Sequence, residues 1–89
     1  MLKTNQLIQL FSKNNRNENI SQQPDIYSMV NIMSYVNVET GIESNGIDYF
    51  SKINILELSK SEMPDETLHN MIEDGWFVTK DKKFIKKIY

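Results

Sequence analysis

The residues from Pro64 to Gly75 carry the sharpest pattern in the sequence, because both ends of a short helix are marked there. Proline suits the first helical position, and Asp65 and Glu66 occupy the first turn, where the helix dipole favours anionic side chains. Gly75 stands where helices commonly end in a left-handed turn. Three apolar side chains at helical spacing would face a core: Leu68, Met71 and Ile72. The pattern predicts a helix over residues 64–74.

Two runs of β-branched and aromatic residues follow this helix. They cover residues 76–79 and 83–89, and the charged residues 80–82 separate them. Such runs, joined by a short polar turn, predict a β-hairpin over residues 76–89. The large aromatic side chains of the hairpin are expected to pack on the core rather than to stack on nucleic-acid bases: Trp76, Phe77 and Tyr89.

The first part of the chain predicts a short helix followed by a loop. Thr4 or Asn5 suits an N-cap, and apolar residues share one stripe of a helix over residues 4–12. These apolar residues are Leu7, Ile8, Leu10 and Phe11. Residues 13–24 are almost wholly polar and rich in asparagine, which predicts a loop. The helix could therefore be an arm that packs on the rest of the chain or on a partner.

Residues 25–37 fit either a helix or a strand. Pro24 and Asp25 suit a first helical turn, and apolar residues then recur at helical spacing: Ile26, Met29, Val30, Met33 and Val36. As a strand, the segment would place Tyr27 and Tyr35 on one face, but Asn31 interrupts that face. We favour the helix. The five methionines are expected to fill gaps in the core: Met1, Met29, Met33, Met63 and Met71.

Residues 38–47 contain the turn-forming pair Asn45-Gly46, and residues 48–59 are predicted to be a helix. Asp48 would be its N-cap, and four residues would share its apolar face: Tyr49, Phe50, Ile53 and Leu56. A short strand in which Ile53 and Ile55 alternate is the other interpretation. If residues 25–37 were a strand, the Asn-Gly pair would form a hairpin and the architecture would change.

These elements predict one small α+β domain over residues 1–89, mainly helical and closed by the C-terminal hairpin. The chain has no cysteine, so packing alone must hold it together, and one histidine leaves little material for a metal site or a nucleophilic dyad. It has no apolar run of about 20 residues and no apolar leader at its start. We therefore expect a cytoplasmic protein without enzymatic activity, cofactor, metal or membrane contact.

Charge is divided sharply along the chain. Residues 47–78 hold seven acids and two lysines, for a net charge of −5. Residues 79–89 hold five lysines and one aspartate, for a net charge of +4. A basic segment of this kind is typical of nucleic-acid contact, although its lysines could equally neutralise the acidic segment or be solvated on a strand.

The stretch from Ile53 to Val78 resembles the helix–turn–helix–wing region of winged-helix proteins. The resemblance equates residues 48–59 with the first helix, 60–63 with the turn, 64–74 with the helix that enters the major groove, and 76–89 with the wing. It departs from the family at the turn, where Ser-Glu-Met stands in place of the small residue and glycine that the family often has. The acids of the second helix are a further departure, because carboxylates repel phosphate.

The resemblance implies a DNA-binding transcription regulator that contacts double-stranded DNA. Its wing would place five lysines on phosphates: Lys80, Lys82, Lys83, Lys86 and Lys87. Its second helix would bring three side chains near base edges: Thr67, His69 and Asn70. The lone histidine is otherwise expected to be a solvated surface residue.

The alternative is a protein-binding inhibitor or adaptor that acts through the acidic face of the same helix. That face would comprise Asp65, Glu66, Glu73 and Asp74. Asn, Ile and Lys make up 30 of the 89 residues and alanine is absent, which indicates an AT-rich genome such as that of a phage or other mobile element. A host protein complex would be the partner. A homodimer through residues 4–12 or 25–37 is compatible with either function.

Overall fold

The computed structural model describes residues 3–12 and 26–89, which form four helices and a four-stranded antiparallel sheet. The helices are α1 (Thr4–Ser12), α2 (Ile26–Met33), α3 (Ile55–Lys60) and α4 (Asp65–Glu73). The strands are β1 (Glu39–Ile42), β2 (Tyr49–Asn54), β3 (Phe77–Val78) and β4 (Phe84–Ile88). The expected α+β class is therefore confirmed. The loop predicted over residues 13–24 lies outside the described residues.

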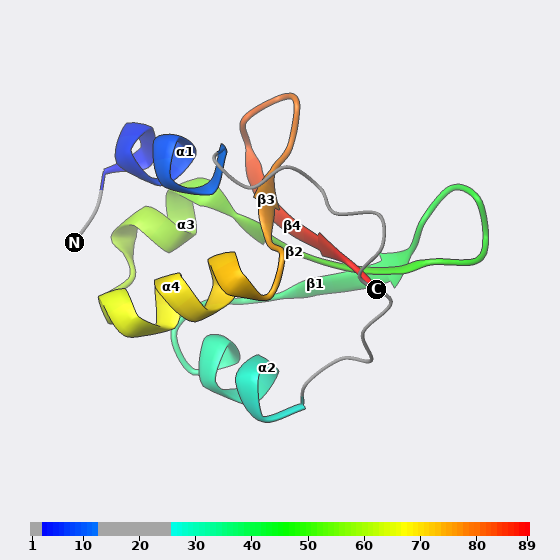
Figure 1. Ribbon diagram of the computed structural model, residues 1–89, viewed down its shortest axis with the longest axis horizontal. Coiled ribbons are helices and arrows are strands. Elements are labelled where there is room, and N and C mark those ends of the chain that lie inside the picture. Colours follow the sequence, from blue (N-terminus) through cyan, green and yellow to red (C-terminus); the bar gives the residue numbers. More distant parts are fainter. Residues whose placement is uncertain (1–2, 13–25) are drawn as a thin grey trace.

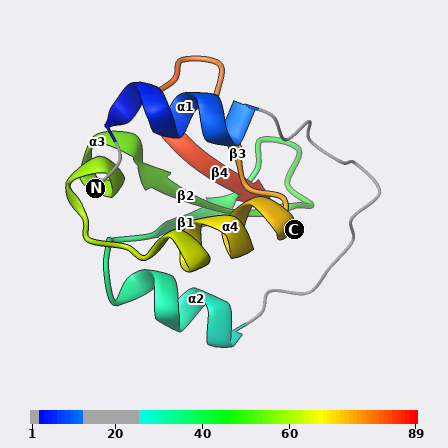
Figure 2. The same ribbon diagram turned by 60° about the vertical axis from the view of Figure 1, so that its left-hand side comes forward.

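The strand order is β1-β2-β4-β3, and the helices lie on one side of the sheet (Figures 1 and 2). Helix α1 lies on the β3 side, α2 lies on the β1 side, and α4 lies between them. In β2 and β4 the buried residues alternate with partly exposed ones, so one sheet face meets the helices and the other remains open.

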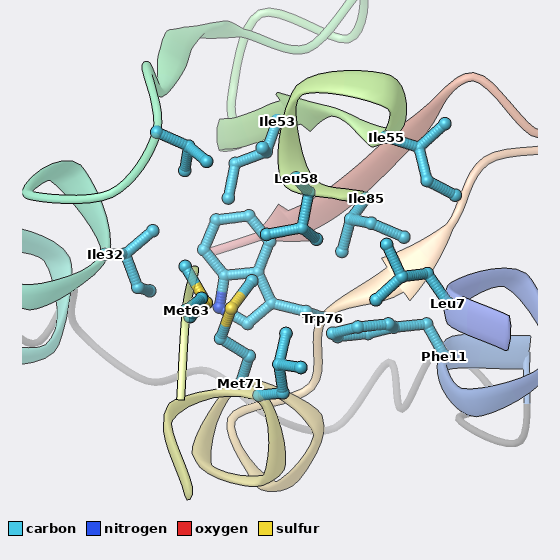
Figure 3. Close-up of a cluster of buried hydrophobic side chains, with 12 residues drawn as sticks. Leu7, Phe11, Ile32, Ile53, Ile55, Leu58, Met63, Met71, Trp76 and Ile85 are labelled. Atoms are coloured by element: carbon cyan, nitrogen blue, oxygen red, sulfur yellow. The ribbon is translucent and has the colours of Figure 1, made fainter. Parts of the chain in front are cut away.

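The core lies between the helices and the covered face of the sheet, with Trp76 at its centre (Figure 3). Leu7 and Phe11 of α1 belong to this core, so α1 packs on the rest of the chain. The prediction that Trp76 would be buried is confirmed, because only 1% of the residue is exposed. Met63 and Met71 are also buried, but Met33 is 56% exposed, so the methionines do not all serve as core residues.

Helix α4 begins and ends near the predicted positions. Its first helical residue is Asp65, and Pro64 is the N-cap with an extended backbone rather than the first residue of the helix. At the other end, Gly75 has a φ of 95°, and the amide of Trp76 donates to the carbonyl of Met71 at 3.1 Å. This Schellman closure turns the chain directly from the helix towards β3.

The predicted helix over residues 48–59 is wrong in its first half. Tyr49–Asn54 is a strand between β1 and β4, and the helix begins only at Ile55. Asn54, rather than Asp48, is the N-cap, and its side-chain oxygen accepts from the amides of Leu56 and Glu57 at 2.9 and 3.3 Å. Leu56 is 57% exposed because the shifted helix turns it away from the core.

The segment predicted as a turn over residues 38–47 contains β1 and the first hairpin. Asn45 and Gly46 lie at its tip, where Gly46 has a φ of 75° and the Asn45 side chain accepts from the amides of Ile47 and Asp48. The hairpin coexists with the predicted helix at α2. The sheet is consequently larger than the expectation of a mainly helical domain allowed.

Replacing Asn54 with alanine is expected to lower the free energy of unfolding by about 1 kcal/mol, because two amides of the first turn of α3 lose their acceptor. The measurement is urea unfolding followed by circular dichroism. N54D is the matched control, since aspartate keeps the accepting oxygen and should retain most of the stability. Equal losses in the two variants would contradict the capping role.

Candidate functional site

Three of the five C-terminal lysines form a basic tip on the β3–β4 hairpin. Lys80, Lys82 and Lys83 are exposed and have no ion pair in the part of the chain that the structure describes. The tip projects beside α1 and away from α4 (Figures 1 and 2). Helix α1 carries no acidic residue, so this neighbouring helix does not neutralise the positive charge of the tip.

Hydrogen bonds within the turn hold this basic tip in place. The amide of Thr79 donates to the carbonyl of Phe84 at 2.9 Å, which closes the hairpin. The Asp81 carboxylate accepts from the hydroxyl of Thr79 and from the amide of Lys83. These bonds keep the pKa of the Asp81 carboxyl below its ordinary value of 3.8, with the Thr79 hydroxyl as the first cause. Lys82 adopts a φ of 58°, an uncommon conformation that the tight turn requires.

The other two lysines do not belong to the basic tip, so the expected set of five is not brought together. Lys87 lies on the covered face of β4 beside Ile85 and is only 6% exposed. Lys86 lies on the open face, where it forms an ion pair with Glu43 and approaches the Phe50 ring to 4.9 Å. Strand alternation causes this separation, because successive side chains point to opposite faces of a sheet.

The three residues expected near base edges are also divided. Thr67 is 7% exposed, and its hydroxyl oxygen accepts from the side-chain amide of Asn31 on α2 at 3.4 Å. The expectation that Thr67 would be exposed is therefore wrong, since α2 covers that flank of α4. His69 and Asn70 are exposed, as expected.

The outward side of α4 forms an acidic face. Asp65, Glu66 and Glu73 are exposed, Asp74 is half-buried at the end of the helix, and the helix itself contains no lysine or arginine. None of these carboxylates makes an ion pair within the described ranges, 3–12 and 26–89. The acidic face is thus intact and separate from the basic tip.

A cluster of Lys52, Phe50, Phe84 and Glu39 on the open face of the sheet could not be predicted from the sequence. The ammonium group of Lys52 lies 4.4 Å from the centre of the Phe84 ring and 5.6 Å from that of Phe50, and it pairs with Glu39 at 3.6 Å. In the sequence alone, Phe50 fits the apolar face of a helix and Phe84 fits a strand, so the pattern does not predict that they are neighbours. Strand alternation places Phe50, Lys52 and Phe84 on one face of the sheet, but this can be deduced only when β2 and β4 are known to be neighbours.

The aromatic residues of the hairpin differ in exposure. Trp76 is in the core, whereas Phe77 and Tyr89 are half-buried, so the expectation of core packing is met in full only by Trp76. Tyr89 lies beside Lys87, whose ammonium group is 5.0 Å from the ring centre.

Neither a metal site nor a membrane span is found in the described part of the chain. Across residues 3–12 and 26–89, no three histidine or acidic side chains gather as metal ligands would. Within the same ranges, no helix has the length and apolar character needed to cross a bilayer. The chain has no match among protein-family models, curated proteins or solved structures.

The hydrogen bonds to Asp81 are expected to loosen only in strong acid. Because the pKa of the Asp81 carboxyl is lower in the folded protein, the contribution of these bonds to stability is present above pH 3.8. That contribution is lost as the pH falls through the lower folded pKa. Titration of the Lys83 amide shift by NMR should therefore have a midpoint below 3.8. T79V is the control variant, since it removes the Thr79 hydroxyl, whose hydrogen bond is the largest cause of the lowered Asp81 pKa. This variant should move the midpoint upwards. A midpoint at or above the ordinary value in the unmodified protein would contradict the bonded turn.

Proposed function

We propose that the chain is a small non-enzymatic binding protein of winged-helix topology, and that it docks on a basic protein surface through the acidic face of α4. Such a protein would act as an inhibitor or adaptor. The observation that carries the proposal is the acidic face itself, since it occupies the position at which a winged helix presents its recognition helix.

The order of elements supports the winged-helix part of the proposal. From β2 the chain runs through α3, a four-residue connection, α4 and the β3–β4 hairpin. In the sheet, β4 lies between β2 and β3, as the third strand of a winged helix lies between the first two. Helix α1 packs beside α3 and β3, as the leading helix of such a domain does (Figure 2). Here β1 adds a fourth strand at the edge.

The charge of α4 supports a protein partner in preference to the major groove. If α4 entered a groove, Asp65, Glu66 and Glu73 would approach phosphates with no base of the helix to offset them. A basic partner would instead gain from the same charges, which steer association and set the orientation of the complex. The exposed side chains of His69 and Asn70 would supply further hydrogen-bonding groups within that interface.

Contact with double-stranded DNA through the basic tip is the second candidate. It is favoured by one observation, the exposure of Lys80, Lys82 and Lys83 on a single bonded turn. With Lys87 buried and Lys86 paired, the contact would involve three phosphates rather than five. Three such contacts give a slope of log K against log salt of about −3.

Neutralising α4 with D65N and E73Q is expected to weaken capture of the protein partner at least about tenfold at low salt. The measurement is affinity capture from bacterial lysates, followed by anisotropy titration of the captured protein with labelled variants. The matched control is Q9K with S44K, which makes the same change in net charge at exposed positions away from α4. Binding is expected to weaken only in the variant with D65N and E73Q. Equal binding by this variant, the control variant and the unmodified protein would reject the acidic face as the binding surface.

The second candidate is tested with a labelled AT-rich duplex between about 50 and 200 mM salt. If the basic tip binds phosphates, anisotropy rises as protein is added, and log K falls with log salt at the slope of about −3 given above. K82E with K83E should abolish this binding. K60E is the control, because Lys60 is an exposed lysine at the end of α3 and outside the tip. A flat titration at low salt would eliminate DNA and leave α4 as the binding surface.

A further inference from the structure

The outer edge of β1, together with the outward side of α2, forms a third surface, which offers main-chain hydrogen-bonding groups and apolar side chains. β1 pairs with β2 on one side, and the described residues place no strand on its other side. We propose that a second copy of this chain pairs with β1 to form a two-fold symmetric dimer with one continuous eight-stranded sheet. This surface is distinct from α4 and from the basic tip, so the inference does not depend on the proposed function.

The hydrogen-bonding phase of the sheet shows which groups of β1 are free to pair. The amide of Glu43 donates to the carbonyl of Asp48 at 2.7 Å, which fixes residues 39, 41 and 43 as those that bond to β2. The main-chain groups of Thr40 and Ile42 therefore point away from the sheet, and both residues are exposed. An unpaired row of this kind is a template for another strand.

The two edges of the sheet differ in how they are protected. The opposite edge strand, β3, has only two residues and is continued by the lysines of the basic tip, features that discourage pairing with another chain. β1 has four residues, with no proline and no lysine, and its one charge, on Glu39, is paired with Lys52. The chain thus blocks one edge and leaves the other able to pair.

A symmetric register satisfies the free groups of β1. With Gly41 opposite its counterpart on the two-fold axis, Thr40 of each chain faces Ile42 of the other, and the outward amides and carbonyls bond reciprocally. Gly41 suits the close approach at the axis because it has no side chain. The nearest acids, Glu39 and Glu43, already pair with lysines of their own chain, so their mutual repulsion is reduced.

Helix α2 supplies apolar area on the same side of the molecule. It lies along the β1 side in both views (Figures 1 and 2), and Val30 and Met33, which share one flank of the helix, are 62% and 56% exposed. Asn31 ties the opposite flank of the helix to Thr67 of α4, so Val30 and Met33 face away from α4. A two-fold axis at Gly41 would bring the two copies of α2 together and cover Val30 and Met33.

The first test is sedimentation velocity of the full chain over a wide range of protein concentration. The unmodified protein should change from monomer to dimer as concentration rises, with no larger species, because a two-fold interface closes on itself. V30K with M33K should weaken the dimer at least about tenfold. L56K is the matched control, since Leu56 is equally exposed but lies on α3, and it should leave the dimer unchanged.

T40P tests the pairing of the edge itself. Its missing amide points away from β2, so the monomer should fold normally by circular dichroism while dimerisation is lost. In the unmodified protein, hydrogen exchange at the Thr40 and Ile42 amides should slow as the dimer forms, whereas the Gly41 amide should be protected throughout. A monomer at every concentration, or a dimer that T40P and V30K with M33K leave intact, would overturn the proposal.

Discussion

The burial of Trp76 is the packing interaction on which the other elements depend. The indole lies at the junction of the α4 end and the start of β3, and side chains from all four helices and from the sheet surround it. The Schellman closure at Gly75 sets the position of the indole, because it turns the chain by a fixed geometry directly before the tryptophan. Because the chain has no disulfides, packing around this single apolar centre holds the helices and the sheet together.

Elements with local signals could be predicted from the sequence, and elements defined by distant partners could not. The helix before Gly75 was predicted because its start, stripe and stop all lie within 12 residues. Strand β2 was missed because Tyr49, Phe50 and Ile53 also fit a helical stripe, and the strand is stabilised by β4, which follows some thirty residues later. The end of β2 depends on Asn54, whose capping role is evident only when the strand is known to stop there.

The same distinction between local signals and distant partners explains which site residues could be located from the sequence. The sequence correctly located the charges on α4 and on the hairpin, but it could not assign faces to the lysines of β4. Lys86 and Lys87 are neighbours in sequence, and the pairing register sends one to an acid on the open face and the other into the protein. Thr67 was misplaced for a related reason, since its exposure depends on α2, which joins the domain from far along the chain.

The approach of Phe50 to Gly41 has a consequence for sequence variation. A Cβ atom at position 41 would lie 2.7 Å from the Phe50 ring, closer than real atoms allow, so the ring occupies the space that a side chain would need. The two positions therefore constrain each other across β1 and β2. Any related chain with a larger residue at 41 must carry a smaller or displaced one at 50, and this paired substitution would mark the first hairpin in an alignment of sequences alone.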